Sequence, residues 1–218
     1  MTRENDLRQD IVDACLEMNA NGLNQGTSGN ISVRFEDQML ISPSATPYSN
    51  MTKDMIVSMD LSKQMTGEWQ GKGKPSTEWR FHWMLMKERT DVTAVIHAHP
   101  PFCTTLAVLR ISIPACHYMI AAFGGTDIRC AGYATFGSPQ LARLAFEALK
   151  DRTACLLANH GMVTVGSGLE QTMWRAVELE TIACQYWQAL LAGNPVILSN
   201  SEIDATGAMF SEYGVQAE

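Results

Sequence analysis

The stretch VTAVIHAHPP, residues 92–101, is an apolar strand that runs directly into two histidines and then two prolines. Residues i and i+2 of a strand point to the same face, so His97 and His99 project together, about 7 Å apart along the chain. Two imidazoles at this spacing can chelate one cation, although one buried structural histidine and one surface histidine would give the same pattern. The stretch therefore predicts a strand that carries two candidate metal ligands to one end of a sheet.

A third histidine supports the metal interpretation. His160 follows the apolar stretch ACLLAN, residues 154–159, and precedes Gly161, where the backbone can turn tightly. Three neutral nitrogen ligands with an open fourth position are typical of a catalytic zinc site. The other two histidines of the chain, His82 in a predicted helix and His117 in a turn-rich segment, are interpreted as structural.

Outward from this stretch, the apolar periodicity predicts a mixture of helices and strands. Strands do not alternate strictly with helices, and several strands form hairpins, which indicates a largely antiparallel or mixed sheet covered by helices. No repeat or linker divides the chain, so we expect one domain over residues 1–218. Helices are predicted at 5–21, 76–89, from 100 onward, 138–150, 169–191 and 201–212, and strands at 30–35, 38–42, 55–59, 92–99 and 154–165.

Composition narrows the class of protein. The net charge of −7 argues against a nucleic-acid surface or an anionic membrane surface as partner. No apolar run approaches the roughly 18 residues of a membrane span, and the N-terminus lacks the apolar core of a signal peptide. Six cysteines without a CxxC pair indicate reduced thiols and a cytoplasmic location.

Three polar loops are candidate anion sites. GTSGN (26–30), ISPSATP (41–47) and KPSTE (74–78) each combine small or hydroxyl residues near an element boundary. Backbone N–H groups in such loops, and at the start of a helix, favour a phosphate. Ser76 is predicted to cap the helix over 76–89, with Glu78 in its first turn either as a residue that complements the helix dipole or as an acid/base. We expect the three loops to lie close together.

Taken together, the motifs TSGNISVR, KPSTEWRFH, VIHAHP, CHYMIAAFGG, YATFG and NHGM resemble the class II aldolase/adducin family in order and spacing, from about residue 5 to Gly214. Within that family the resemblance is greatest to the L-fuculose-1-phosphate aldolases. The resemblance implies a three-layer α/β fold, with a mostly antiparallel sheet between helical layers, and a homotetramer with active sites at subunit interfaces. It also implies one Zn²⁺ per subunit, with Mn²⁺ or Co²⁺ as alternatives.

The resemblance also implies roles for individual residues. The family's metal ligands correspond to Glu78, His97, His99 and His160. Its acid/base corresponds to Glu78, and its tyrosine from the neighbouring subunit corresponds to Tyr118. The phosphate site corresponds to Gly29, Asn30, Ser44, Ala45, Ser76 and Thr77, and the aldehyde pocket involves Phe136, Phe210 and Tyr213.

This sequence departs from the fuculose aldolase pattern at three of these motifs. Ala45 stands in place of a glycine, Thr77 in place of a serine, and Asn159 in place of a histidine beside a metal ligand. The reaction implied is reversible cleavage of a ketose 1-phosphate to dihydroxyacetone phosphate and a small aldehyde. L-fuculose 1-phosphate, 5-deoxyribulose 1-phosphate and 5-methylthioribulose 1-phosphate are the candidate substrates, which leaves sugar catabolism and methionine salvage both open.

Three other functions were weighed. A pentulose-phosphate 4-epimerase of the same family carries an aspartate in the loop after the metal strand, whereas HYMIAAFGG (117–125) contains no carboxylate. A methylthioribulose-1-phosphate dehydratase of the family would eliminate water instead of splitting a carbon–carbon bond. A non-catalytic scaffold like the adducin head has no need for three histidines and a glutamate together.

Overall fold

A single mixed sheet organises the chain. The computed structural model describes residues 3–212. The strands are β1 (Asn30–Phe35), β2 (Gln38–Ile41), β3 (Val57–Asp60), β4 (Ala94–Ala98), β5 (Ile113–Pro114), β6 (Asp127–Ala131), β7 (Ala154–Leu157) and β8 (Gly161–Gly166). Their order in the sheet is β3-β2-β1-β4-β8-β7-β6-β5, and every neighbouring pair is antiparallel except β6 and β7. The predicted, mostly antiparallel sheet is confirmed.

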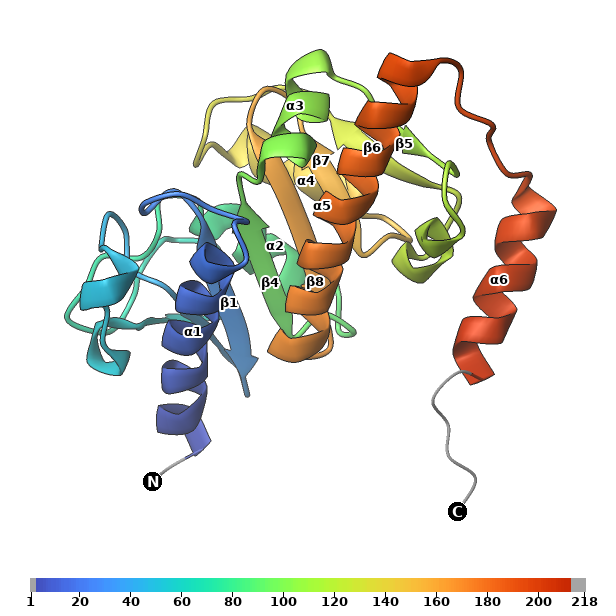
Figure 1. Ribbon diagram of the computed structural model, residues 1–218. Coiled ribbons are helices and arrows are strands. Elements are labelled where there is room, and N and C mark those ends of the chain that lie inside the picture. Colours follow the sequence, from blue (N-terminus) through green and yellow to red (C-terminus); the bar gives the residue numbers. More distant parts are fainter. Residues whose placement is uncertain (1–2, 213–218) are drawn as a thin grey trace.

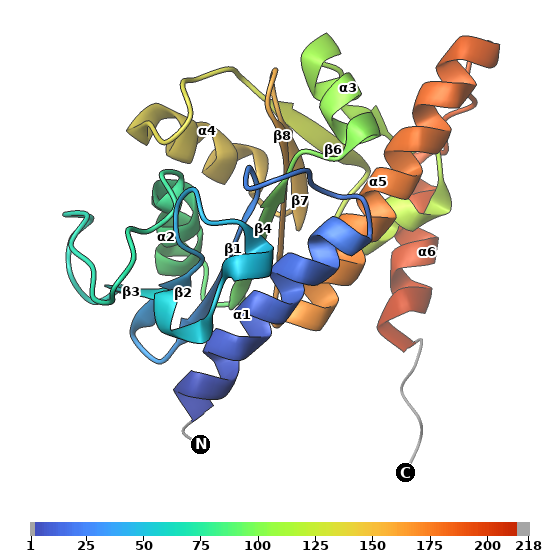
Figure 2. The ribbon, with the colours of Figure 1, turned by 60° about the vertical axis from the view of Figure 1, so that its left-hand side comes forward.

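Helices cover both faces of this sheet (Figures 1 and 2). One face carries α2 (Trp79–Glu88) and α4 (Pro139–Ala148), and the other carries α1 (Arg3–Ala20), α3 (Pro101–Leu109) and α5 (Leu169–Ala192). The last helix, α6 (Asn200–Glu212), packs against the short helix η3 (Tyr118–Phe123). Two further short helices, η1 (Tyr48–Asn50) and η2 (Lys53–Met55), lie between β2 and β3. The arrangement is the three-layer α/β fold that the sequence predicted.

The strand period of two explains the two hydrophobic cores. Val95 and Val163 belong to the core under α2 and α4. Ile96 and Met162 belong to the core on the opposite face, under α1, α3 and α5. Because the central strands are buried on both faces, their sequences are almost continuously apolar.

The start of α2 differs from the sequence prediction. The helix begins at Trp79, and Glu78 occupies the N-cap position that was predicted for Ser76. Residues 75–76 are held in an extended segment, because Pro75 bridges to Pro43 and Ser76 N donates to Ser42 O. Ser76 instead closes a turn, with its hydroxyl accepting from Glu78 N at 3.3 Å. Glu78 therefore lies immediately before the first residue of α2 and not within the helix.

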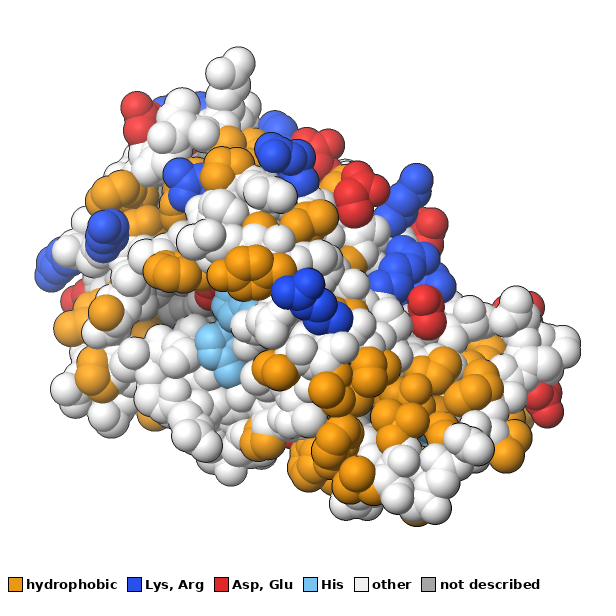
Figure 3. Space-filling view, turned by 90° about the horizontal axis from the view of Figure 1, so that it is seen from above, with side chains coloured by type: hydrophobic (Ala, Val, Ile, Leu, Met, Phe, Trp, Pro, Cys, Tyr) orange, Lys and Arg blue, Asp and Glu red, His pale blue; other side chains and the backbone are white. Residues whose placement is uncertain are grey.

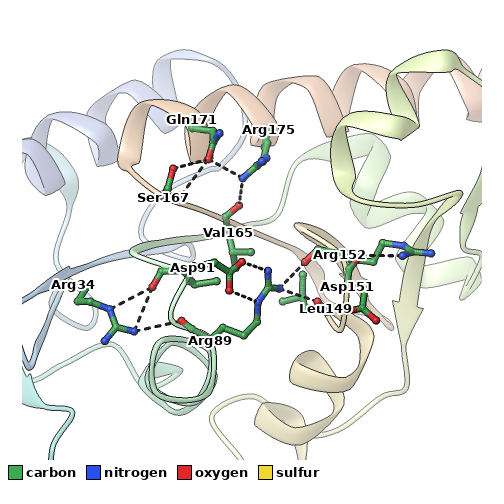
Figure 4. Close-up of polar contacts among 11 residues, drawn as sticks. Arg34, Arg89, Asp91, Leu149, Asp151, Arg152, Val165, Ser167, Gln171 and Arg175 are labelled. Carbon is green, nitrogen blue, oxygen red and sulfur yellow. Dashed lines mark hydrogen bonds and ion pairs between the residues drawn. The ribbon is translucent and has the colours of Figure 1, made fainter. Parts of the chain in front are cut away.

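Arginines tie the helices to the end of the sheet where β4 begins (Figure 4). Arg34 donates to the carbonyls of Met86 and Arg89 at the end of α2. Arg89 in turn donates to the carbonyls of Leu149 and Arg152 after α4 and pairs with Asp91. The contact with Met86 satisfies a carbonyl in the last turn of α2, and the contacts with Leu149 and Arg152 join the end of α2 to the segment after α4. The histidines lie at the opposite end of β4.

Two global features bear on earlier expectations. No helix among residues 3–212 is long and apolar enough to cross a membrane.

All six cysteines lie in the described part of the chain as free thiols, and Cys15, Cys103 and Cys155 are buried. The absence of disulfides there agrees with the expected reduced thiols.

Candidate active site

Three histidines converge at the end of β4. His97 lies in the strand, His99 follows it, and His160 lies in the turn between β7 and β8. Each offers a ring nitrogen, and these nitrogens all lie within 4.8 Å of one another. His97 Nε2 and His99 Nε2 are 2.9 Å apart. Figure 3 shows histidine side chains at the edge of a hollow in this face of the molecule.

Strand pairing explains why His160 reaches the other two. Ala98 on β4 lies opposite Met162 on β8, so the turn before β8 sits beside the end of β4. The approach is close: a Cβ at Gly161 would lie 2.5 Å from Ala98 O and 2.5 Å from His99 Cδ2. Only glycine fits this contact without a shift of backbone or ligand.

The hydrogen bond of His97 and the protonation states of His99 and His160 suit metal binding. His97 Nδ1 lies 2.8 Å from Met162 O, so it carries the hydrogen and leaves Nε2 with a lone pair facing the cluster. Burial, with the nearby His97 and His160, lowers the pKa of His99 to about 3. Burial and the nearby His97 lower the pKa of His160 to about 4. Neutral imidazoles are the form that binds a metal.

Glu78 completes the cluster from the mouth of α2. Its Oε2 lies 3.0 Å from His97 Nε2 and its Oε1 lies 3.3 Å from His160 Nε2. Burial would raise the pKa of this carboxyl group, but His97, His160 and the amide of Asn30 lower it to about 2. Burial would likewise lower the pKa of His97, but the Glu78 carboxylate raises it. A buried carboxylate that faces imidazole lone pairs is repelled by them unless a positive charge lies between them.

A divalent metal ion fits this donor set. The side chain of Glu78 is buried, yet its Oε1 has no hydrogen-bond partner among residues 3–212. Two ligands bound about 2.0–2.1 Å from one zinc ion lie about 3.3 Å apart in a tetrahedral site. The distances between Glu78 and His97 and between Glu78 and His160 fall near this value. The three imidazoles thus form a group that could hold a metal ion, and the Glu78 carboxylate lies against it.

The three predicted anion loops converge beside the cluster. Ser44 N donates to Lys74 O, which joins the second loop to the third. Ile31 N donates to Ser42 Oγ at 3.1 Å, which joins the first loop to the second. Their predicted phosphate contacts are Gly29, Asn30, Ser44, Ala45, Ser76 and Thr77. Ala45 has a φ of 52°, in the left-handed region that favours glycine. The structure thus explains why a glycine suits position 45.

The remaining predicted residues divide into two groups. Phe136 is 64% exposed and precedes Gly137, whose carbonyl accepts from Arg80 and whose Cα lies against Thr77 O. It therefore lies close to the anion loops of its own chain. Tyr118 of η3 and Phe210 of α6 contact each other, with ring centroids 6.3 Å apart, and α6 lies away from β4 (Figures 1 and 2). Tyr213 lies outside the described residues.

Two residues that support the site were not predicted from the sequence. Tyr48 is buried and donates from its hydroxyl to Gly29 O at 2.6 Å, which fixes the first anion loop. His82, interpreted as structural, is fully buried and contacts both Ser32 and Asn30. Its position four residues after Glu78 was an available signal, because residues at this spacing share one helix face.

A cavity of about 590 Å³ adjoins the cluster at His99. His99 lines it together with Asn24 and Ser28, Thr104 and Leu109 of α3, and Trp187 of α5. The cluster therefore borders space for a small organic molecule, as a substrate site requires.

Comparison with known proteins identifies the family. The sequence model of the class II aldolase and adducin N-terminal domain matches residues 9–187. This chain belongs to that family. Over 212 residues, 97% of this chain and 94% of the relative, it is 46% identical to a 5-methylthioribulose-1-phosphate/5-deoxyribulose-1-phosphate aldolase of Rhodospirillum rubrum. It is 45% identical to the L-fuculose phosphate aldolase of Escherichia coli, over 98% of both chains.

A solved structure agrees with the sequence comparison. An L-fuculose 1-phosphate aldolase superimposes on this class II aldolase chain with a TM-score of 0.89 at 36% sequence identity, covering 94% of this chain and 96% of the other. The predicted family, fold and enzyme class, a metal-dependent aldolase, are confirmed.

Proposed function

We propose that this enzyme is a zinc-dependent aldolase that reversibly cleaves a ketose 1-phosphate to dihydroxyacetone phosphate and a small aldehyde. The observation that carries the proposal is the position of the Glu78 carboxylate, which lies against His97 and His160 and also accepts a hydrogen bond from Asn30 of the first anion loop. Ligands for a Lewis acid, a base and an anion cradle in one place match the needs of aldol cleavage.

Phosphate binding orients the substrate. The loops around 29–30, 44–45 and 76–77 offer backbone N–H groups, hydroxyls and the N-terminus of α2. A phosphate held there fixes the position of the adjoining C2 carbonyl and C3 hydroxyl, which lowers the entropic part of the barrier. Gly29, Asn30, Ser44, Ala45, Ser76 and Thr77 are the residues that we assign to this role.

His97, His99 and His160 would hold the zinc ion, with Glu78 as the fourth ligand while no substrate is bound. When bound, a divalent cation there supplies a Lewis acid that stabilises negative charge on the carbonyl oxygen. Mn²⁺ or Co²⁺ would serve the same electrostatic purpose.

Glu78 and Tyr118 move the protons. As the C3–C4 bond breaks, its electron pair stays on the three-carbon fragment and the C4 hydroxyl loses its proton to become an aldehyde. Glu78 takes up a proton from solvent water and delivers it to C3, which yields dihydroxyacetone phosphate, and removes it again in the synthetic direction. Tyr118 exchanges the proton of the C4 oxygen.

Tyr118 would act in the site of a neighbouring subunit. It is 51% exposed and contacts Phe210 of α6, a helix that lies away from β4, the strand that carries His97 (Figure 1). A cyclic homotetramer would bring this pair of rings to the next subunit's metal cluster, where Phe136 also lies and where the aldehyde end of the substrate would rest. The small-molecule substrate, the acidic net charge and the free cysteines favour a cytoplasmic enzyme without nucleic-acid or membrane partners.

Product analysis tests the reaction. The metal-loaded protein is incubated separately with L-fuculose 1-phosphate, 5-deoxyribulose 1-phosphate and 5-methylthioribulose 1-phosphate, and the products are identified by mass spectrometry. A three-carbon phosphate from at least one substrate supports the aldolase, and the relative rates identify the preferred aldehyde. A product with an unchanged carbon skeleton would instead indicate the epimerase or, with loss of water, the dehydratase.

A further inference from the structure

A buried row of polar side chains lies behind Glu78. Asn30 Nδ2 donates to Glu78 Oε2 at 3.1 Å. Asn30 Oδ1 lies 2.5 Å from His82 Nε2, and His82 Nδ1 lies 2.7 Å from Ser32 Oγ. All four side chains are buried, so each polar atom depends on its neighbour in this row.

The chemistry of these groups fixes the direction of every hydrogen bond. The Glu78 carboxylate can only accept, so Asn30 must turn its NH₂ toward Glu78 and its carbonyl oxygen toward His82. That oxygen needs a donor, so His82 carries its hydrogen on Nε2. Burial lowers the pKa of His82 to about 3, so the ring is neutral and its Nδ1 accepts from the Ser32 hydroxyl.

Backbone packing holds the row in place. The side chains of Asn30 and Ser32 lie on the same face of β1. Asn30 lies opposite His97 in the β1–β4 ladder. His82 projects from α2 toward that face and stacks on Phe81, with ring centroids 4.5 Å apart. Phe81 also meets the ring of His97 edge-on. The side-chain amide of Asn30 is thus engaged by Glu78 and His82.

We propose that His82 and Ser32 are positioning residues for the acid/base Glu78, acting through the amide of Asn30. The Ser32 hydroxyl sets the tautomer of His82, His82 sets the orientation of the Asn30 amide, and that amide anchors Glu78 Oε2. The second oxygen, Oε1, has no hydrogen-bond partner among the described residues and is the atom that exchanges the proton with C3. This inference rests on the proposed aldolase function.

The most direct measurement is exchange of the C3 proton of dihydroxyacetone phosphate with deuterium oxide, followed by NMR. This half-reaction needs Glu78 but no aldehyde, and it reports proton transfer separately from bond cleavage. Ser32→Ala removes only the hydroxyl, so that His82 can adopt the other tautomer and Asn30 can turn its oxygen toward Glu78. His82→Leu removes the donor to Asn30, and His82→Gln keeps an N–H that can donate to it.

Loss of a partner behind an active-site ligand typically costs about 10- to 100-fold, and we expect Ser32→Ala and His82→Leu to slow exchange by about that factor. We expect His82→Gln to lose less, and all three to keep their zinc content and the KM for dihydroxyacetone phosphate. Ser58→Ala is the matched control, because Ser58 is a buried serine of the same sheet whose hydroxyl donates to Gln38, away from Glu78. Its exchange rate should stay at the wild-type value.

The outcomes separate this inference from the function on which it rests. If the zinc-loaded wild type exchanges the proton but Ser32→Ala and the two His82 variants do so equally fast, the positioning role is wrong and the aldolase stands. If the variants slow exchange only in proportion to lost zinc, the row is merely structural and the inference is again wrong. If the wild type itself neither exchanges the proton nor cleaves a ketose 1-phosphate, the aldolase proposal fails and takes the inference with it.

Discussion

The carboxylate of Glu78 lies 3.0 Å from the imidazole of His97, where the mouth of α2 meets the end of β4. The fold brings these two residues together, because β1 lies beside β4 and α2 packs on one face of the sheet that these strands form. One short contact therefore joins the helix that begins at the anion loops to the strand that carries the metal ligands. The chemistry that we propose depends on this junction.

Glu78→Gln tests the acid/base role. The amide is nearly isosteric and keeps an oxygen that can face the cluster, but it cannot take up a proton. We expect kcat for ketose 1-phosphate cleavage to fall by about a hundred- to ten-thousand-fold, while zinc content, measured by elemental analysis, is largely retained. Glu147→Gln, at an exposed position of α4, is the control. Turnover near the wild-type rate in Glu78→Gln would remove Glu78 from this role.

Mixing two inactive variants tests whether Tyr118 acts in a neighbouring site. Tyr118→Phe should lose cleavage but keep exchange of the C3 proton, whereas Tyr186→Phe, in α5, should keep both. When Tyr118→Phe and Glu78→Gln protomers are dissociated and reassembled in equal amounts, about a quarter of the sites pair an intact Glu78 with an intact Tyr118. Cleavage activity should recover to that level. Recovery of no activity would contradict a site shared between subunits.

Gly161→Ala tests the close approach behind the metal cluster. The added Cβ would lie 2.5 Å from a backbone oxygen of β4 and from the ring of His99, so the turn that carries His160 must shift. We expect zinc affinity, measured by competition with a chelator, to fall by about tenfold or more. Gly207→Ala, where a Cβ meets nothing within 4 Å, should leave zinc affinity unchanged. Equal affinities in the two variants would argue against the predicted strain.

Thr77→Val tests the anion site. The substitution preserves shape and removes one hydroxyl at the mouth of α2, where a phosphate would accept a hydrogen bond. A hydrogen bond to a charged group contributes about 1.5–3 kcal/mol, so KM for the ketose 1-phosphate should rise by about 10- to 150-fold. Inhibition by inorganic phosphate should weaken in parallel. Unchanged KM and unchanged inhibition would place the phosphate elsewhere.

The three histidines and all strands except β5 and β6 could be predicted from the sequence because their signals are local. Apolar runs ended by histidines specify both the strands and the face to which His97 and His99 point. The convergence of His160 with them depends on the pairing of β4 with β8, and local patterns do not specify which strands pair.

The start of α2 was predicted wrongly, and the partners of His82 were not predicted, for a related reason. Ser76 has the chemistry of an N-cap, but tertiary contacts of residues 75–76 with residues 42–43 hold it in an extended segment. In the sequence, His82 has the same pattern as any other buried residue of an amphipathic helix. Only the packing of α2 against β1 reveals that its two nitrogens meet Ser32 and Asn30.

The account depends most on a metal that makes carbon–carbon cleavage possible at the cluster of Glu78 and the three histidines. Protein freed of metal by a chelator, and the same protein reloaded with one equivalent of zinc, should be assayed side by side for dihydroxyacetone phosphate released from the three ketose 1-phosphates. We predict that reloading restores cleavage of at least one substrate, and that His97→Ala, treated identically, regains none. Equal cleavage by metal-free and zinc-loaded protein, or full recovery by His97→Ala, would contradict the account.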